Sequence, residues 1–260
     1  MYRNLATIFI LTSSLGGTIM NDNDPSAATD GPQAFLAAVS AGQTEHVAEL
    51  LATDTALADA TDNRGTTALL LALYHKHDAV AAQIRAARQH MSVFEAAALG
   101  DVPALRDHYR ADERCFEEYS TDGFSPLHLA SFFGNTSAMR FILANGGDVE
   151  AVAKNPSKVR PLHSAAATRK ANVVRVILAA GADADSQQMG GHTAMHSAVM
   201  HDNLAMTTVL LSNGADVDVK NEEGQSAIDL AEKHDARQCL SMLRAIPRII
   251  SDSETPNVDG

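Results

Sequence analysis

Tryptophan is absent from the 260-residue sequence, and aromatic residues account for only 5% of it. The apolar fraction is nevertheless 45%, and alanine supplies much of it. A chain of this length and apolar content can bury a substantial core. The shortage of large rings therefore favours many short, closely packed helices over a core built from a few large side chains.

Cysteine is nearly as scarce. The only two cysteines, Cys115 and Cys239, are separated by most of the chain, so they support neither a disulfide framework nor a cysteine-based metal site. The sequence also lacks the nucleophile elbow GxSxG, the phosphate-binding loop GxxxxGK[ST] and the dinucleotide fingerprint GxGxxG. We therefore expect no enzyme activity, no catalytic residue and no cofactor.

Basic residues are outnumbered, with 20 Lys and Arg against 32 Asp and Glu and a formal net charge of −12. Neutralising phosphates requires a surplus of Lys and Arg, so this balance argues against nucleic acid as a partner. Apolar runs are short as well, and none approaches the ~20 residues that cross a membrane. We expect no membrane partner either.

The first 19 residues leave two interpretations open. Arg3, the apolar run from Leu5 to Leu11 and the small residues after it have the outline of a weak secretory signal. The alternative is a start at Met20, followed by an ordinary disordered N-terminus. We expect residues 1–31 to form either a weak signal peptide or a disordered N-terminus. We expect the protein to be cytoplasmic, with a secreted or periplasmic location as the alternative.

An internal repeat organises the rest of the sequence. SPLHLASFFG from Ser125 and RPLHSAAATRK from Arg160 share one pattern, and so do HTAMHSAV and GQSAIDLAEKHD further on. The matching apolar residues follow one another at spacings of 34, 24, 34, 35, 33 and 33, and they are Phe35, Leu69, Val93, Leu127, Leu162, Met195 and Ile228. A recurring period of this size is typical of a repeat solenoid.

The residues of one unit predict its local structure. Ser125 is a suitable N-cap and Pro126 suits the first helical position, so we expect a short helix that ends at Gly134. A second helix should follow from about Thr136, and Gly146 should stop it by taking a left-handed conformation. Each helix pair can bury its apolar face only against neighbouring pairs, which predicts an elongated stack.

These units resemble the ankyrin repeat, whose TPLHxA signature is matched most closely by SPLHLA and RPLHSA. Each copy also ends as an ankyrin repeat ends, with Gly146, Gly181 and Gly214 just after an apolar helical run. The resemblance covers residues 32–244 and implies an all-α solenoid of about seven helix-turn-helix repeats with short hairpin fingers. The first and last repeats are expected to act as caps, and residues 245–260 to form a disordered tail.

One unit departs from the period. Val93 follows Leu69 by only 24 residues, and no cluster of turn-forming residues lies between Ala81 and His90. We expect the second helix of repeat two to pass almost directly into the first helix of repeat three. This connection would delete one finger and leave a gap in the row of fingers.

The 11 histidines raise the possibility of a metal site. His192 and His196 have the i, i+4 spacing that, on a helix, could present two imidazoles to the metal ion of an enzyme. However, His128, His163 and His196 all occupy the histidine position of the repeat signature, where the ankyrin family uses the ring to hydrogen-bond neighbouring turns. A position shared by several repeats favours a structural role, and we expect no metal.

The resemblance also implies where a partner protein would bind: to the finger tips and to the exposed end of each first helix, on the concave face. The candidate residues at the helix ends are Tyr74, His75, Leu99, Phe132, Phe133, Thr168, Met200 and His201. Phe132 and Phe133 stand out because large exposed rings concentrate binding energy in interfaces. The alternative is that one or both pack inward against the neighbouring repeat.

A second candidate feature is electrostatic. Residues 151–182 contain six basic residues and no acidic one, so the rest of the chain carries a net −18. The six are Lys154, Lys158, Arg160, Arg169, Lys170 and Arg175. We expect the first five to attract an acidic or phosphorylated segment of a partner, the alternative being a solvated surface. The sequence thus predicts a monomeric, non-catalytic adaptor, scaffold or inhibitor.

Overall fold

The computed structural model of the chain describes residues 31–245. The expected N-terminal segment or signal, up to residue 30, and the expected tail from residue 246 on lie outside the described residues. Residues 31–245 are all-helical and contain no β-strand, apart from an isolated β-bridge between Thr61 and Thr67. None of the helices in this range is long and apolar enough to cross a lipid bilayer.

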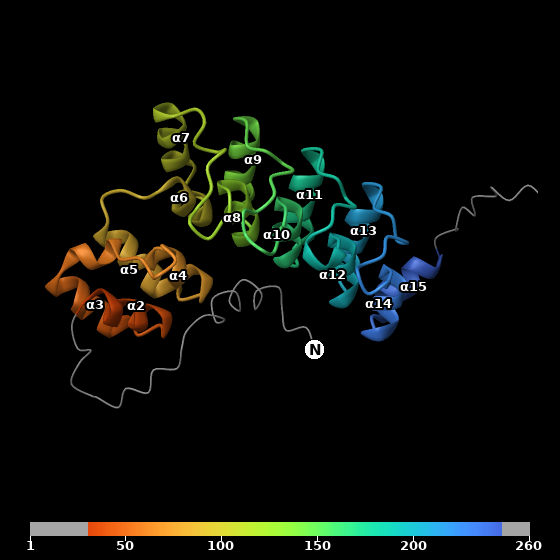
Figure 1. The fold of residues 1–260 in the computed structure, drawn as a ribbon, viewed down its shortest axis with the longest axis horizontal. Helices are drawn as coiled ribbons and strands as arrows, with labels where there is room; N and C mark the ends of the chain where they lie inside the picture. The colour runs from red at the N-terminus through yellow and green to blue at the C-terminus, as the bar shows by residue number, and fades with distance from the viewer. Residues whose placement is uncertain (1–30, 246–260) are drawn as a thin grey trace, which may run out of the picture.

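Residues 31–245 form seven consecutive helix pairs, as Figure 1 shows. The pairs are α2 (Pro32–Ser40) with α3 (Thr44–Thr53), α4 (Ala68–Tyr74) with α5 (Asp78–Ala87), α6 (Val93–Leu99) with α7 (Val102–Ala111), α8 (Pro126–Phe133) with α9 (Thr136–Ala144), α10 (Pro161–Ala167) with α11 (Ala171–Ala179), α12 (Ala194–Met200) with α13 (Leu204–Ser212), and α14 (Ala227–Lys233) with α15 (Arg237–Ala245). Short 3₁₀ helices, Thr55–Asp59 and Met189–Gly191, lie in connecting segments.

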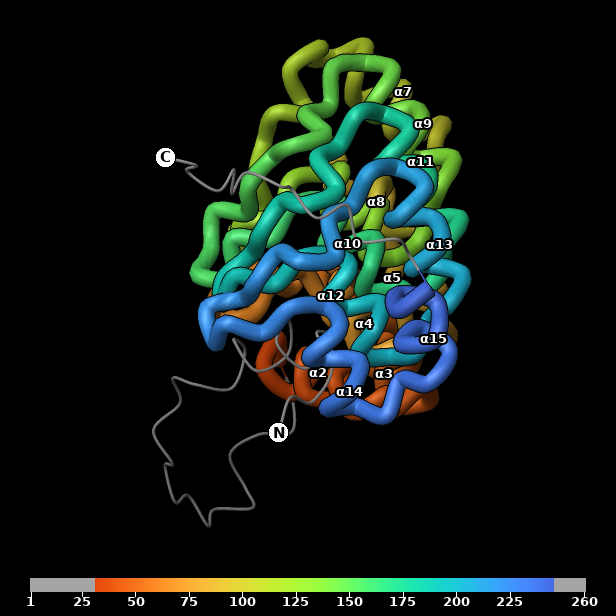
Figure 2. The backbone as a smooth tube through the Cα atoms, turned by 90° about the vertical axis from the view of Figure 1, so that its right-hand side faces the viewer, coloured from red at the N-terminus to blue at the C-terminus, as the bar shows by residue number. Residues whose placement is uncertain are grey.

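Neighbouring pairs stack in the way that defines a solenoid. First helices pack on first helices, as α8 does on α6 and α10, and second helices pack on second helices, as α11 does on α9 and α13. Seen along the long axis of the molecule, successive turns of the chain overlie one another (Figure 2). The predicted architecture of about seven helix-turn-helix repeats is therefore confirmed.

Side-chain capping sets where the first helices begin. In α8 the Ser125 Oγ accepts the His128 N–H at 3.4 Å, while the His128 Nδ1 accepts the Ser125 N–H at 3.2 Å. Thr193 and His196 form the same reciprocal box in α12. At the other end of α8, Gly134 has φ 77 and closes the helix in the left-handed conformation.

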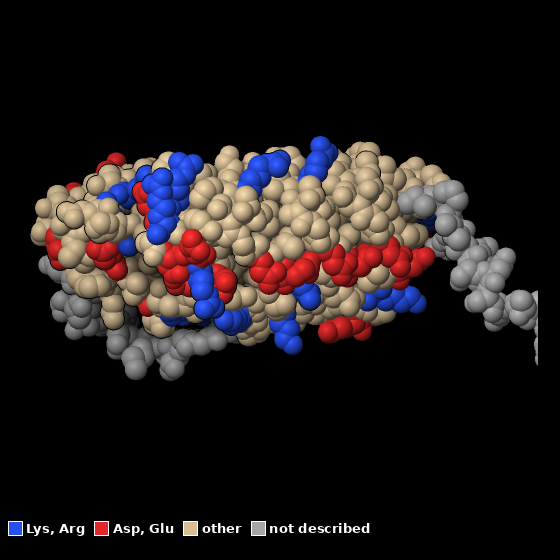
Figure 3. Space-filling model, turned by 90° about the horizontal axis from the view of Figure 1, so that it is seen from above, with Lys and Arg blue, Asp and Glu red and all other residues tan. Residues whose placement is uncertain are grey.

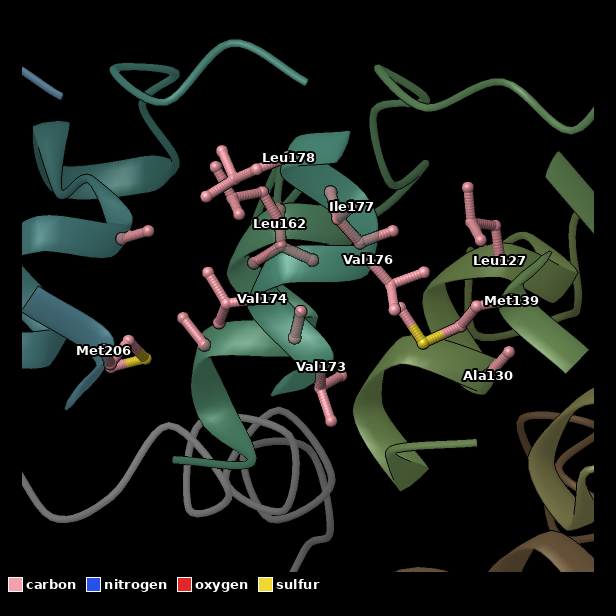
Figure 4. Packing of buried hydrophobic residues seen from close by; sticks show 14 of the residues in the cluster. Leu127, Ala130, Met139, Leu162, Val173, Val174, Val176, Ile177, Leu178 and Met206 are labelled. Atoms are coloured by element: carbon pink, nitrogen blue, oxygen red, sulfur yellow. The ribbon is translucent and has the colours of Figure 1, made fainter. Parts of the chain in front are cut away.

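The apolar side chains at the shared repeat position form the core between the stacked pairs (Figure 4). Leu127 and Leu162 are each 1% exposed there. Met139 of α9 and Val176 of α11 belong to the same buried cluster, and the packing of α9 on α11 joins repeat four to repeat five. Ile228, at the same position in the last repeat, is only half-buried, as a terminal unit requires.

The core is divided at the junction between repeats two and three. One cluster of buried side chains comes from residues 35–84, and the other from Leu70 and residues 93–243. Outer helix α3 packs on α5, and α7 packs on α9, but α5 and α7 share no comparable interface. The apolar packing through the outer helices is therefore interrupted at this junction.

The connection across the junction is direct, because residues 88–92 link α5 to α6 without a finger, as the sequence predicts. The predicted gap in the row of fingers is wrong, however. Gly65, at the tip of the finger before α4, faces Thr121 in the finger before α8, and a Cβ on Gly65 would lie 2.8 Å from the Thr121 Cγ2. With the intervening finger deleted, its two neighbours close against each other.

The cap of α6 corrects the alignment of repeat three. Ser92 is the N-cap, and Glu95 forms the capping box that histidine forms in α8. Phe94, rather than Val93, therefore stands at the position of Leu127. Helix α6 has 7 residues and α8 has 8. The last residues of the two helices therefore align at the predicted spacing, whereas their N-caps align one residue away from it.

Candidate protein-binding surface

The candidate residues at the helix ends occupy equivalent places because the first helices of repeats two to seven close in the same way. In each of these repeats the first helix is followed within two residues by a residue with positive φ. These residues are Lys76, Gly100, Gly134, Arg169, Asp202 and Asp235. The repeated closure sets the preceding side chains in a row along the inner helices.

Three aromatic side chains from two non-adjacent repeats form one cluster in this row. The ring centroid of Tyr74 lies 5.6 Å from that of Phe133 and 6.0 Å from that of Phe132, and the two phenylalanine rings are 5.2 Å apart. Tyr74 closes α4 and the phenylalanines close α8, so the cluster spans repeat three. All three side chains are half-buried, and Tyr74 and Phe133 also pack against the core.

The position of Tyr74 is held by a polar contact. Its hydroxyl donates a hydrogen bond to Oδ2 of Asp122 at 3.0 Å. Burial and the adjacent carboxylate raise the pKa of the Tyr74 phenol well above its usual value, so the phenol stays a neutral donor. The sequence did not predict a role for Asp122. Its position in the turn STDG of a finger indicates a turn and not a contact with Tyr74.

Two further candidates, Thr168 and Lys170, lie next to the end of α8. A Cβ built on Gly134 would lie 3.8 Å from the Thr168 Cγ2 and 3.9 Å from the Lys170 Nζ. Both side chains come from the loop between α10 and α11 and reach back over the preceding repeat. An ammonium group therefore stands close to the glycine that follows Phe133.

The row continues toward repeat seven with Arg169 and His201. Burial, together with the positive charge of Arg169 and with His234, lowers the pKa of His201. The Asn203 Nδ2 donates to the carbonyl oxygen of Arg169 at 2.8 Å, which ties the helix-end loops of repeats five and six together. Met200, the last residue of α12, is half-buried.

The remaining helix-end candidates lie at the N-terminal end of the row. His75 stacks on His77 with ring centroids 5.9 Å apart, and burial and this second imidazole lower the pKa of His75. Leu99 is half-buried and packs against the N-terminal core cluster rather than standing free on the surface. Its contribution is therefore to the junction between repeats two and three.

The six basic residues of 151–182 do not form one patch. Three lie in the finger before α10, two between α10 and α11, and one, Arg175, on outer helix α11. Within the finger, the Lys154 ammonium stands 3.9 Å from the centroid of the Tyr119 ring, and the Arg160 Nε lies 3.0 Å from Oε2 of Glu150. Lys158 is exposed and has a left-handed φ of 49.

Carboxylates form a band on the side of the molecule where the turns after α9, α11 and α13 lie. Oε1 of Glu150 accepts the Asp183 N–H at 2.7 Å, and Oδ1 of Asp185 accepts the Asp216 N–H at 2.8 Å. Burial and the neighbouring carboxylates of Asp216 and Asp183 raise the pKa of Asp185. Figure 3 shows Asp and Glu gathered in a row along this face. An acidic partner would be repelled here.

Comparison with known protein families identifies the repeat. The family model for ankyrin repeats, in three copies, matches residues 93–188 and 162–247, which together cover more than half of the chain. The chain belongs to the ankyrin-repeat family. The helix pairs α2–α3 and α4–α5 precede the matched residues and follow the same plan.

A human protein, DNA-binding protein RFXANK, is 32% identical to the chain over 74 residues. The match covers 28% of this chain and 28% of that protein. The chain thus matches little more than a quarter of this relative's length.

The histidines of the ankyrin signature have structural roles. Nε2 of His128 lies 3.0 Å from the carbonyl oxygen of Val159 in the next finger, and Nε2 of His163 lies 3.0 Å from that of Ser186. Since the Nδ1 of His128 accepts a backbone N–H, Nε2 carries the proton and donates. Burial lowers the pKa of both rings to about 4.

The His192 and His196 pair is not arranged as the metal hypothesis requires. Helix α12 begins at Ala194, so His192 precedes it and the two residues do not share a helix face. His196 already uses both ring nitrogens, with Nδ1 3.0 Å from the Thr193 N and Nε2 3.2 Å from the Gln225 O. Among residues 31–245, no group of three or more His, Cys, Asp or Glu side chains is arranged to hold a metal ion.

Proposed function

We propose that this ankyrin-repeat protein is a non-catalytic interaction module that binds a partner protein through its concave face and finger tips, as an adaptor, scaffold or inhibitor. The observation that carries the proposal is the cluster of Tyr74, Phe132 and Phe133. Three half-buried rings held at 5.2 to 6.0 Å from one another offer a partner a rigid apolar contact. Such contacts supply most of the binding energy of an interface.

We further propose that the partner presents an acidic or phosphorylated segment beside an apolar side chain. Support comes from Lys170, whose ammonium lies near the end of α8, and from Arg169 beside it in the loop between α10 and α11. Lys158 adds a positive charge at an exposed finger. The carboxylate band at the turns after α9, α11 and α13 would repel an acidic segment that docked there.

The name of the human relative says that it binds DNA, but we do not extend this function to the present protein. Its net charge of −12 and its carboxylate band oppose contact with phosphate backbones. A monomeric state and a cytoplasmic location stay predictions of the sequence.

The experiment that tests the proposal is capture of partners by the immobilised full-length chain, followed by mass spectrometry. A Phe132→Ala/Lys170→Glu variant should lose the partners that the unmodified chain retains. Arg175→Glu is the matched control, because it makes the same charge change on outer helix α11 and should leave capture unchanged. Recovery of the same partners by all three proteins would contradict the proposed surface.

A further inference from the structure

A buried carboxylate stands in repeat three at the capping position where repeats four to six have a histidine. Glu95 is 0% exposed and occupies the capping position that His128 occupies in repeat four. The His128 ring reaches forward, to the carbonyl of Val159 in the next finger. Glu95 instead reaches backward, where Oε1 accepts a hydrogen bond from the Thr67 Oγ1 at 2.6 Å and pairs with the Arg88 guanidinium.

Arg88 extends this contact to the N-terminal repeats. It belongs to the 88–92 link, its side chain is 10% exposed, and its Nε lies 2.8 Å from Oδ1 of Asp59. We call Asp59, Thr67, Arg88 and Glu95 the junction cluster. A second ion pair, Arg85 with Asp101 at 2.8 Å, also crosses the junction.

Ionic contacts of this kind behave differently from an apolar core. A buried charge is tolerated only while it is paired, and removal of one partner leaves the other uncompensated. In a repeat protein, stability is the sum of the repeats and the interfaces between neighbours, so the molecule opens first at its weakest interface. The core is divided between repeats two and three, and α5 and α7 share no interface comparable to those of the other outer helices. The junction is therefore the weakest interface.

We propose that residues 32–87 form a unit that docks on residues 93–245 through the junction cluster and opens from them as a whole about residues 88–92. In the docked state the fingers on the two sides meet at Gly65 and Thr121. In the open state the two core clusters stay intact, because the buried residues of each lie on one side of the link, apart from Leu70. The partly buried Leu73, Tyr74 and Leu99 also pack across the link and would separate on opening.

The opening would dismantle the aromatic cluster, because Tyr74 lies on one side of the link while Phe132 and Phe133 lie on the other. This consequence for binding rests on the proposed function. A partner that contacts all three rings would bind only the docked form and would therefore stabilise it. The docking equilibrium would then set the apparent affinity.

The unmodified full-length chain provides the first test. Native-state hydrogen exchange, followed by mass spectrometry over a range of low denaturant concentrations, measures the opening of each helix. The amides of α2 to α5 should share one opening reaction, at lower denaturant than the amides of α8 to α13. A single opening reaction common to all the repeats would overturn the proposal, and so would independent opening of α2–α3 and α4–α5.

The second test uses Glu95→Gln, which keeps an acceptor for the cap but removes the charge that pairs with Arg88. Exchange in residues 32–87 should become about tenfold faster while α8 to α13 keep their protection. Asp229→Asn changes the same capping position in repeat seven and should leave residues 32–87 unaffected. A change confined to the first turn of α6, or spread evenly over the chain, would refute the role of the junction cluster.

The first test does not depend on whether the Glu95→Gln variant folds, because it uses the unmodified chain. No partner is added in either measurement. Failure to find a partner would therefore count against the proposed function alone, and uniform exchange would count against the docking unit alone.

Discussion

The hydroxyl of Tyr74 donates to Oδ2 of Asp122 across 3.0 Å, although 48 residues separate them in the chain. The bond joins the end of a helix in repeat two to the finger that precedes repeat four. The bond spans repeat three, at the junction where no finger separates α5 from α6. The aromatic cluster and the division of the core lie at the same junction.

Tyr74→Phe should lower the free energy of unfolding by about 1 to 2 kcal/mol, because it removes a hydrogen bond to a carboxylate and leaves Asp122 without this donor. The ring and its contacts with Phe132 and Phe133 are kept. Chemical denaturation of both proteins measures the difference. An unchanged denaturation midpoint would show that the bond contributes nothing to stability.

Gly65→Ala tests the contact between fingers across the deletion. The added Cβ would lie 2.8 Å from the Thr121 Cγ2, and the backbone φ of 78 is itself unfavourable for alanine. Gly224→Ala is the matched control, because φ is 74 there and no atom lies within 4 Å of the added Cβ. Both variants should melt at a lower temperature than the unmodified protein. The free energy of unfolding should fall further for Gly65→Ala than for Gly224→Ala, by roughly 1 kcal/mol. Equal losses would mean that the fingers do not touch in solution.

Phe132→Ala should weaken partner binding by about tenfold or more, with a small loss of stability. Phe133→Ala should cost more stability, on the order of 2 kcal/mol, because Phe133 also packs against the core. Affinity and urea denaturation are measured on both variants. A large stability loss with unchanged affinity for Phe132→Ala would make it a structural residue only.

Charge reversal at Lys158 and Lys170 should slow association with an acidic partner, and the effect should shrink as salt is added. Arg160 is unsuitable for this test, since its reversal would place a carboxylate against Glu150, 3.0 Å away in the present pair. Association rates at low and physiological ionic strength measure the effect. A salt-independent rate in the unmodified protein would argue against electrostatic steering.

Acid should destabilise the repeats through His128 and His163, whose pKa values burial lowers from 6.5 to about 4. Between these values the unfolded chain binds protons that the folded chain does not, so stability is present above pH 6.5 and is lost as the pH falls toward 4. Each ring contributes roughly 3 kcal/mol over that window.

Urea unfolding between about pH 7 and pH 5 checks this slope. His163→Asn should make the slope shallower, because one of the two buried rings is then absent. A denaturation midpoint that does not move with pH would contradict the assignment of neutral, buried imidazoles.

Much of the fold could be predicted because its signals are local. Ser125, Pro126 and Gly134 act within one or two helical turns, so their sequence spacing was enough to place α8. The absent finger after α5 could be inferred in the same way. Its consequence could not, because whether Gly65 and Thr121 meet depends on how whole repeats pack.

The candidate site was predicted less completely. The helix-end positions follow from the repeat, but six basic residues that are close in sequence are distributed over a finger, a loop and an outer helix. Arg160 is already paired with Glu150, which lies one residue outside the segment that lacks acidic residues. Closeness in sequence therefore does not place these six side chains on one surface.

The sequence by itself determined the repeated helix pair, its caps and the family, because capping, helical periodicity and left-handed glycines act over a few residues. The tertiary structure decided which side chains from different repeats meet, such as Tyr74 with Phe133 and Arg88 with Glu95. Those contacts depend on the stacking of successive repeats and on the junction where a finger is missing. No local pattern encodes that arrangement, and it is the arrangement that creates both the candidate surface and the proposed opening.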